Sequence, residues 1–304
     1  MGLFNRKINL GMTIDSGVIR LVCLEKVKGS FILIAAREVS IPQSVVSGGV
    51  VIQVEPVAQA IEELWEQMGI DTHEVYLGIV NQNLLIKLVD LPKLPKNKIS
   101  QALHWQIGNY IPAPTEDWVY DFVVVKDSGT KDNQMQVLLS AVKSDLLENT
   151  LQAAQKADLT VRGIEPISLS LLRLVPQEWR WTNFLLANMA EDLTTLMLTQ
   201  EGVPYAFRIL PHSFSDSEEF RQAVNTFLTD QDSSPQINAL LLSGQGAKLT
   251  TRPQYLQDKL SIKTMVLDPW IFLQMGKENT SVPSEDMRFQ GPDYAAVVSI
   301  AMGE

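Results

Sequence analysis

The sequence of 304 residues contains a single cysteine, Cys23, which excludes an intrachain disulfide framework and fits a reducing compartment. Basic residues are also scarce, because 25 Lys and Arg stand against 35 Asp and Glu, giving a formal net charge of −10. Sequence-independent binding of nucleic acid needs a basic surface, so we expect no nucleic-acid partner. The longest apolar runs, such as FILIAA, fall far short of the ~20 residues of a membrane-spanning helix.

The sequence also lacks the common motifs of catalysis. It contains no P-loop, no GxSxG elbow and no GxGxxG after a strand, so no motif indicates a hydrolase or a dinucleotide-binding protein. The three histidines, His73, His104 and His212, are far apart and have no cysteine partners, and we therefore expect no metal site. Cys23 lies among the apolar residues of a predicted strand, which favours a small core residue over a reactive thiol.

A repeated order of elements is present in the two ends of the chain. Near the N-terminus, three strands lead into a helix over 54–69, whose apolar residues fall on one face at helical spacing. The same order recurs later, followed by a strand and a helix. The three strands of the first copy are predicted at 8–14, 19–27 and 31–39, and those of the second at 184–189, 194–199 and 205–210.

The segment between these copies has a different character. The pattern strand-strand-helix occurs twice in residues 73–158, and this segment is compact enough to form a subdomain of its own. We therefore predict three parts: a first subdomain of residues 1–72 and 159–178, an inserted α+β subdomain at 73–158, and a second domain at 179–304. In the second domain only one helix and a polar loop connect the third strand to the strand at 239–242, so its own insertion is short.

The duplication resembles the actin-like ATPase fold, a ribonuclease H-like α/β architecture with a nucleotide cleft between two related domains. The stretch LVDLPKLPKNKISQALHWQIGNYIPAPTEDWVYDFVVV, residues 88–125, is similar to the PilM family of type IV pilus assembly, relatives of the cell-division protein FtsA. Three further stretches resemble the same family: TVRGIEPISLSLLRL, NALLLSGQGAKL and GPDYAAVVSIAMG. The fold implied is α/β, with actin-like duplicated domains, an inserted α+β subdomain and a reduced second-half insertion.

The function implied by this resemblance is that of a binding protein. PilM-like proteins lie on the cytoplasmic face of the inner membrane and capture the short N-terminal peptide of PilN in a groove beside the inserted subdomain. Through PilN they connect indirectly to PilO, PilP and the pilus motor ATPases. The candidate peptide-binding residues are Leu84, Ile86, Leu88, Trp105, Asn109 and Tyr110. The aromatic residues among them have a simpler interpretation, as the core of the inserted subdomain.

The phosphate loops depart from the family pattern. The first loop of the family reads acid-hydrophobic-Gly, and here Thr13 occupies the acid position and Asp15 the glycine position. The second loop, Asp-hydrophobic-Gly in the family, is Asn188-Met189-Ala190. A carboxylate where phosphate should touch the backbone is repulsive. We therefore expect no ATPase activity and no cofactor, with vestigial cofactor-binding positions at Ser16, Gly17, Gly244, Gly246 and Ala247.

Two alternatives stay open at this point. The chain could be an active actin-like protein that binds ATP with Mg²⁺ and whose nucleotide state gates partner binding. It could also be the cytoplasmic domain of a type II secretion L protein, although those chains normally continue into a transmembrane helix. The preferred hypothesis is a cytoplasmic, peripherally membrane-associated PilM-like adaptor, with motility, adhesion and DNA uptake all possible as the downstream process.

Overall fold

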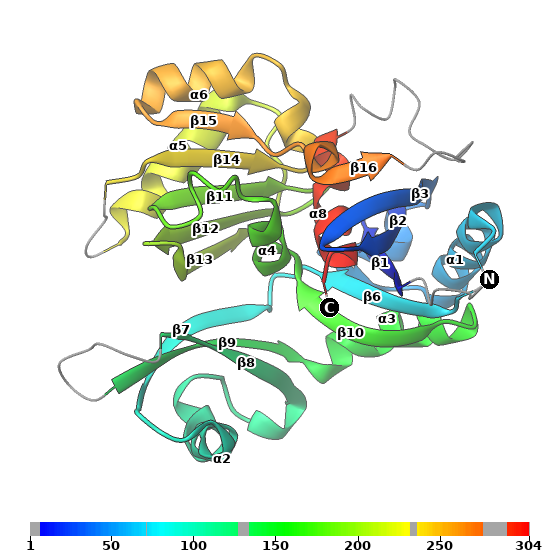
Figure 1. Cartoon of the computed structure of the whole chain (residues 1–304), viewed down its shortest axis with the longest axis horizontal. Coiled ribbons are helices and arrows are strands. Elements are labelled where there is room, and N and C mark those ends of the chain that lie inside the picture. The colour runs from blue at the N-terminus through cyan, green and yellow to red at the C-terminus, as the bar shows by residue number, and fades with distance from the viewer. Residues whose placement is uncertain (1–6, 71, 127–133, 232–235, 276–290, 304) are drawn as a thin grey trace.

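The structure, a computed structural model, describes residues 7–70, 72–126, 134–231, 236–275 and 291–303 (Figure 1). Two large β-sheets form the body of the molecule, and a three-stranded sheet projects from it. Most of the predicted polar hairpin after residue 125 lies outside the described residues, as does the N-terminal tail.

The first large sheet begins with three consecutive antiparallel strands, as predicted. The fourth and fifth strands of this subdomain lie parallel to β1, and a short sixth strand joins β3 at the opposite edge. The order of the sheet is β10-β6-β1-β2-β3-β16. The strands are β1 (Lys7–Asp15), β2 (Val18–Val27), β3 (Ser30–Ser40), β6 (Glu74–Ile79), β10 (Thr160–Pro166) and β16 (Leu273–Met275).

Strand β2 is buried on both faces, which explains its nearly continuous apolar sequence. Ile19, Leu21 and Cys23 enter the core formed with helices α1 (Val54–Met68) and α3 (Ser144–Lys156). The alternate residues, Val22 and Leu24, face the opposite side of the sheet. Cys23 is fully buried, and burial raises its thiol pKa to about 12, so the prediction of a core cysteine is confirmed.

The second large sheet repeats the topology of the first. Its order, β13-β12-β11-β14-β15, matches β3-β2-β1-β6-β10 strand for strand, which confirms the predicted duplication. Helices α5 (Ser217–Thr229) and α6 (Arg252–Leu260) cover its outer face. The strands are β11 (Phe184–Met189), β12 (Thr194–Gln200), β13 (Val203–Leu210), β14 (Ala239–Ser243) and β15 (Lys263–Val266).

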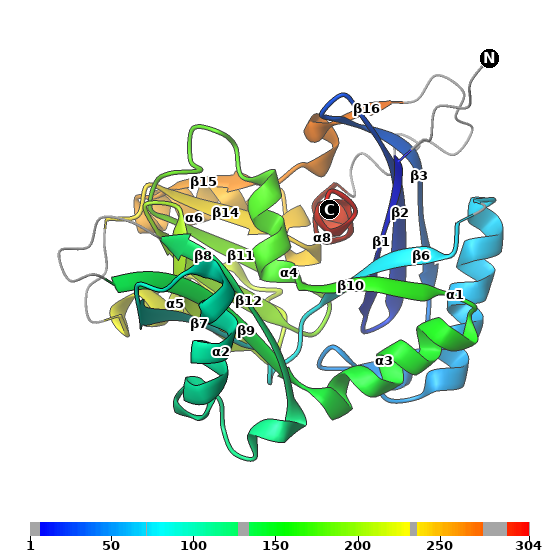
Figure 2. The same cartoon turned by 60° about the horizontal axis from the view of Figure 1, so that its bottom comes forward.

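Helix α8 (Gly291–Ala301) lies between the two large sheets and is seen nearly end-on in Figure 2. All of its residues except Pro292 are buried. Its approach to β1 depends on Gly11, where a Cβ atom would lie 2.6 Å from both the Ala301 amide nitrogen and the Val297 carbonyl oxygen. The C-terminal helix therefore packs directly on the backbone of the first sheet.

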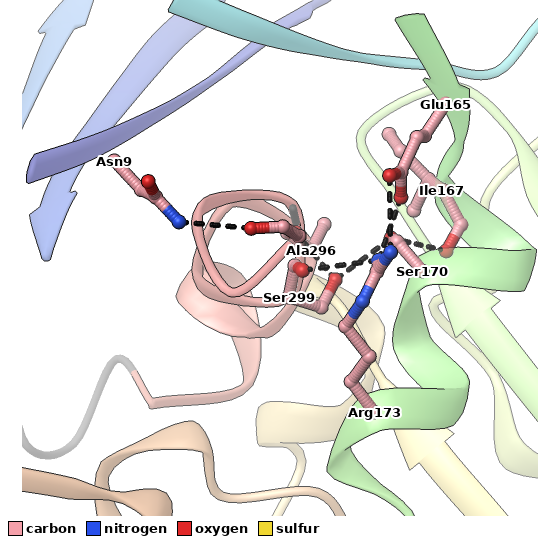
Figure 3. A network of polar contacts seen from close by, with 8 residues as sticks. Asn9, Glu165, Ile167, Ser170, Arg173, Ala296 and Ser299 are labelled. Atoms are coloured by element: carbon pink, nitrogen blue, oxygen red, sulfur yellow. Dashed lines mark hydrogen bonds and ion pairs between the residues drawn. The ribbon is translucent and has the colours of Figure 1, made fainter. Parts of the chain in front are cut away.

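Polar contacts fasten α8 to its neighbours (Figure 3). The hydroxyl of Ser299 lies 2.8 Å from that of Ser170, at the end of α4 (Ile167–Ser170). Arg173 donates to the Ser299 carbonyl oxygen at 3.3 Å and to Glu165 at 2.6 and 3.0 Å. On the other side, the Asn9 amide of β1 donates to the carbonyl oxygen of Gly303 at 2.8 Å. These bonds fix the helix in the first subdomain.

Several predicted boundaries need correction. The predicted insertion at 73–158 included β6 and α3, but β6 pairs with both β1 and β10 in the first sheet, and α3 packs against α1. The predicted second domain at 179–304 included β16 and α8, which also belong to the first subdomain. Both errors arise because a strand or helix that returns to an earlier sheet carries no local signal of its destination.

The inserted subdomain is a three-stranded antiparallel sheet with order β7-β9-β8 and one helix on one face. Met135, Val137 and Leu139 of β9 pack toward that helix. The alternate residues of β9 therefore face the other side, toward β10. The elements are β7 (Leu85–Pro92), α2 (Lys96–Gln106), β8 (Trp118–Lys126) and β9 (Gln134–Lys143).

Short elements complete the architecture. The hairpin of β4 (Val46–Ser47) and β5 (Val50–Val51) precedes α1. The predicted helix at 95–110 ends at Gln106 and continues as a 3₁₀ turn, Ile107–Asn109. The predicted helix at 167–174 likewise divides into α4 and a 3₁₀ turn, Leu171–Leu174.

Candidate functional site

The first candidate site is the cleft where the two large sheets meet, at the turn between β1 and β2. Asp15, Arg20, Asn188, Glu191 and Asp293 are among the residues that line it. The space left between these side chains is about 10 Å³. A cavity of that size accommodates about one water molecule, whereas ligand pockets measure roughly 300–1,000 Å³. The side chains of the chain itself therefore occupy this cleft.

Arg20 of β2 is the centre of the cleft. Its side chain is 9% exposed and is surrounded by carboxylates from both halves of the molecule. Arg20 Nε donates to Glu38 of β3 at 2.9 Å. The other three carboxylates lie within ion-pair distance of its terminal nitrogens: Asp15 at 3.7 Å, Asp293 at 3.7 Å and Glu191 at 4.0 Å. We call Arg20 and these four acids the Arg20 cluster.

Contacts from the second domain extend this cluster. Lys248, from the 3₁₀ turn Gln245–Lys248, forms an ion pair with Asp293. The amide of Gln245 lies within hydrogen-bond distance of both Glu191 oxygens. A separate bond crosses the cleft nearby, where the Gly48 backbone N–H donates to Asp192 at 2.8 Å. The cluster therefore connects β1, β2, β3 and α8 of the first subdomain to two loops of the second domain.

Burial and charge shift the titration of these groups. Burial raises the pKa of Asp15, and Asp192 and Asp293 raise it further, although the nearby Arg20 charge opposes them. Burial likewise raises the pKa of Glu191. Burial disfavours the charge on Arg20, but Asp15, Asp293 and Glu38 outweigh that effect and raise its pKa. Arg20 thus stays charged, and Asp15 and Glu191 are harder to ionise than free carboxylates.

The predicted cofactor positions take part in packing. The Ser16 hydroxyl donates to the Val46 carbonyl oxygen at 2.9 Å, and neither Ser16 nor Gly17 lines the cleft. Gly244, at φ +80°, lies so close to Met189 that a Cβ atom would be 2.4 Å from its carbonyl oxygen. A Cβ at Gly246 would be 2.7 Å from the Met189 Cβ, and Ala247 is buried behind it.

A buried arginine, Arg252, bonds to the loop after β14, which contains Gly244, Gly246 and Ala247. The Arg252 guanidinium is fully buried and donates to the carbonyl oxygens of Gly246 at 2.6 Å, Phe214 at 2.7 Å and Ser215 at 3.0 Å. Burial lowers its pKa. Arg252 therefore links the loop after β14, through Gly246, to the segment that precedes α5.

The second candidate site is a groove between the inserted sheet and β10, which we call the β8–β10 groove. Two adjoining pockets of about 90 and 290 Å³ share Asp121, Ser140, Ile164 and Pro166 as lining residues. The walls come from β8 and β9 on one side and from β10 on the other. Most of its lining residues are apolar, and Asp121, Ser140, Glu165 and Arg173 contribute polar or charged groups.

The structure separates the predicted peptide-binding residues into two groups. Leu84 lines the β8–β10 groove, and Ile86 and Leu88 pair with Ser140 and Leu138 on the same face of the inserted sheet. By contrast, Trp105, Asn109 and Tyr110 belong to the helical segment on the opposite face and line neither of the pockets of this groove. Trp105 is 79% exposed, whereas Tyr110 packs against the inserted core.

Sequence reasoning missed Arg20, Lys248 and Asp293. One signal was available for the last of these, because Asp293 is the single charged residue in the apolar segment GPDYAAVVSIA. A buried charge requires a partner of opposite sign. Its partners lie far away in the sequence, so the pairing itself could not be read locally.

The described residues contain neither a metal-ligand cluster nor a helix suited to span a membrane. Within them, no group of three or more His, Cys, Asp or Glu side chains is arranged to hold a metal ion. None of the helices in the described ranges is both long enough and apolar enough to cross a bilayer.

Two sheets that share a five-strand order and meet at a cleft, with a subdomain inserted in the first half, define an actin-like two-domain protein. Within that class, the chain belongs to the PilM family of type IV pilus assembly proteins. The family model described as "Type IV pilus assembly protein PilM" matches residues 11–171, more than half of the 304 residues.

Solved structures agree with this fold. A structure of the "PilM-PilN type IV pilus biogenesis complex" is similar with a TM-score of 0.81 and 22% identity, covering 97% of each chain. The ethanolamine utilization protein EutJ from Carboxydothermus hydrogenoformans has a TM-score of 0.58 and 11% identity, covering 99% of this chain and 91% of its own. The cytoplasmic domain of EpsL, from the type II secretion system of Vibrio cholerae, has a TM-score of 0.51 and 12% identity, covering 97% and 95%. At these identities the likenesses show the fold alone.

Proposed function

We propose that this protein is a peptide-binding adaptor of type IV pilus assembly, which captures the N-terminal cytoplasmic peptide of a PilN-like membrane protein in the β8–β10 groove. Membership of the PilM family and the resemblance to a chain of a PilM–PilN complex support this proposal. The adaptor would thereby be held at the cytoplasmic face of the inner membrane. Its links to PilO-like, PilP-like and motor proteins would be indirect, through that partner.

The groove has the chemistry that an extended peptide requires. Strand β8 is the edge of the inserted sheet and β10 is the edge of the first large sheet, so both have one edge without a neighbouring strand among the described residues. Val119 and Val123, on one face of β8, are 53% and 55% exposed, with Asp121 between them. Free backbone groups supply affinity, and alternate side-chain contacts supply specificity, when a peptide adds to a sheet edge.

The cleft chemistry favours an adaptor over an enzyme. A nucleotide would have to displace Arg20 from four carboxylates and then place its phosphates among those acids. Removing one partner of a buried ion-pair group is strongly unfavourable, and phosphate beside carboxylate adds repulsion. We therefore propose a pseudo-ATPase with no nucleotide cofactor. The alternative is a nucleotide-gated ATPase, in which the cluster opens to admit ATP with Mg²⁺.

A peptide titration tests the proposal. We would measure fluorescence anisotropy of a labelled N-terminal peptide from the PilN-like partner, with a scrambled peptide as control. Val123→Asp places a charge on the apolar wall of the groove, and we expect binding to weaken at least about tenfold, since burying an uncompensated carboxylate costs several kcal/mol. The matched control is Ile271→Asp, a change at a 71% exposed position far from the groove. Absence of binding by the wild type, or equal losses in both variants, would contradict the proposal.

A further inference from the structure

A second groove lies at the β7 edge of the inserted sheet, where β7 meets β13 of the second domain. Its volume is about 570 Å³, which exceeds that of either pocket in the β8–β10 groove. The residues that line it include Leu85, Lys87, Trp118, Lys143, Phe207 and Arg208. We call it the β7–β13 groove.

Both strands that form this groove are sheet edges. Strand β7 is the last strand of the order β7-β9-β8, and β13 is the last strand of the order β13-β12-β11-β14-β15. Within the described part of the chain, neither has a hydrogen-bonded strand on its outer edge, although the two strands contact one another. Figure 1 shows β13 at the lower edge of its sheet and β7 at the start of the inserted sheet. Backbone donors and acceptors therefore line the groove from two directions.

The charge of the groove is opposite to that of the protein. Three cations, Lys87, Lys143 and Arg208, line it, and its described lining contains no Asp or Glu. Arg208 has an ion-pair partner in Asp230 at 2.7 Å, but Lys87 donates only to a neutral group, the Tyr110 carbonyl oxygen at 3.0 Å. Within the described residues Lys143 forms no ion pair. In a chain with a net charge of −10, this concentration of cations favours an acidic ligand.

Apolar side chains accompany these cations. Leu85, Phe207 and Ile209 are half-buried and line the same groove. In an extended segment, side chains alternate between two faces at a period of two residues. A segment in which acids alternate with aliphatic residues would therefore present carboxylates to the lysines and aliphatic groups to Leu85 and Phe207.

We propose that the β7–β13 groove is a second docking site, which binds an extended segment of a protein partner whose acidic residues alternate with aliphatic ones. The site differs from the β8–β10 groove in that the second domain forms one of its walls, although Leu84 lines both grooves. The adaptor would then hold two partners, one between its inserted subdomain and the first large sheet and one between its inserted subdomain and the second large sheet.

The test uses the full chain and a synthetic probe. The probe is a fluorescein-labelled peptide of about 10 residues, the length of a long strand, in which Glu alternates with Val. We expect saturable binding with a dissociation constant below about 1 mM, which corresponds to a binding free energy of at least roughly 4 kcal/mol. In the variant Lys87→Glu with Lys143→Glu, binding should weaken at least about tenfold by charge reversal.

Two controls make the result decisive. Lys259→Glu introduces a negative charge on the exposed surface of α6, and it should leave binding within about twofold of the wild type. A peptide in which Lys alternates with Val should not bind. The proposal is overturned if the acidic peptide fails to saturate, if the basic peptide binds equally well, or if Lys259→Glu causes the same loss. It is also overturned if the double variant loses binding only to vesicles of anionic lipid, which would make the groove a lipid site.

Discussion

Replacement of Arg20 by methionine is the most informative single perturbation of the cleft. Methionine keeps a long aliphatic side chain but removes the positive charge that Asp15, Glu38 and Asp293 share. Lys248 still pairs with Asp293, so the loss falls mainly on the other carboxylates. The first subdomain would retain its packing, while the ion pair of Arg20 with Glu191 of the second domain would be lost.

The expected magnitude follows from the burial of this group. Arg20 is 7% exposed, and removing one partner from a buried ion pair costs about 3–5 kcal/mol. For a chain of this size, each kcal/mol lowers the melting temperature by roughly 2–4 °C, so a fall of about 10 °C is expected. Partial protonation of Asp15 and Glu191, whose pKa values burial already raises, would limit the loss.

The assay is thermal unfolding followed by circular dichroism, with Arg162→Met as the matched control. Arg162 also pairs with a carboxylate of a neighbouring strand, Glu74, but both side chains are about half exposed. Exposed ion pairs contribute little, so the control should keep its melting temperature almost unchanged. An unchanged or higher melting temperature for Arg20→Met, or an equal fall in both variants, would refute the structural role of the Arg20 cluster.

Two further predictions concern stability. Gly11→Ala should destabilise the protein by about 3 kcal/mol in urea unfolding, because the added Cβ would lie 2.6 Å from the backbone of α8. The control is Gly108→Ala, whose added Cβ would lie 3.9 Å from its nearest neighbour and should change the stability little. For Asp15, a pKa raised in the folded state means that the folded protein binds more protons than the unfolded one, so stability increases as the pH falls through that pKa. The melting temperature of wild type minus that of Asp15→Asn should therefore rise as the pH falls from about 7 to 4, and a pH-independent difference would contradict this assignment.

Local patterns in the sequence predicted most of the fold. The helix at 54–69 was predicted from its apolar spacing and its terminal glycine, and α1 ends at Met68, followed by Gly69 in a left-handed conformation. Long strands with β-branched and aliphatic residues, such as β2 and β3, were also predicted within a residue or two. The strands β15 and β16 were missed because four and three residues give too short a pattern to distinguish from a loop.

The cleft was harder to predict, because its interactions join residues that are distant in the sequence. The altered phosphate loops were visible as Asp15 and Asn188. The sequence did not show that Arg20 would fill the cleft, because the partners of Arg20 come from β1, β3, α8 and a loop of the second domain. The β8–β10 groove depends in the same way on the side of the inserted sheet that α2 leaves uncovered.

The most direct test of the adaptor proposal is calorimetric titration of the PilN-like N-terminal peptide into the full chain, with and without millimolar Mg²⁺ and ATP. We predict saturable binding whose dissociation constant is the same, within about twofold, in both conditions, since only a ligand with different affinities for two states of the protein can shift their populations. A tenfold or larger change in affinity with ATP would contradict the account and favour the nucleotide-gated alternative, and absence of peptide binding in both conditions would contradict the adaptor function itself.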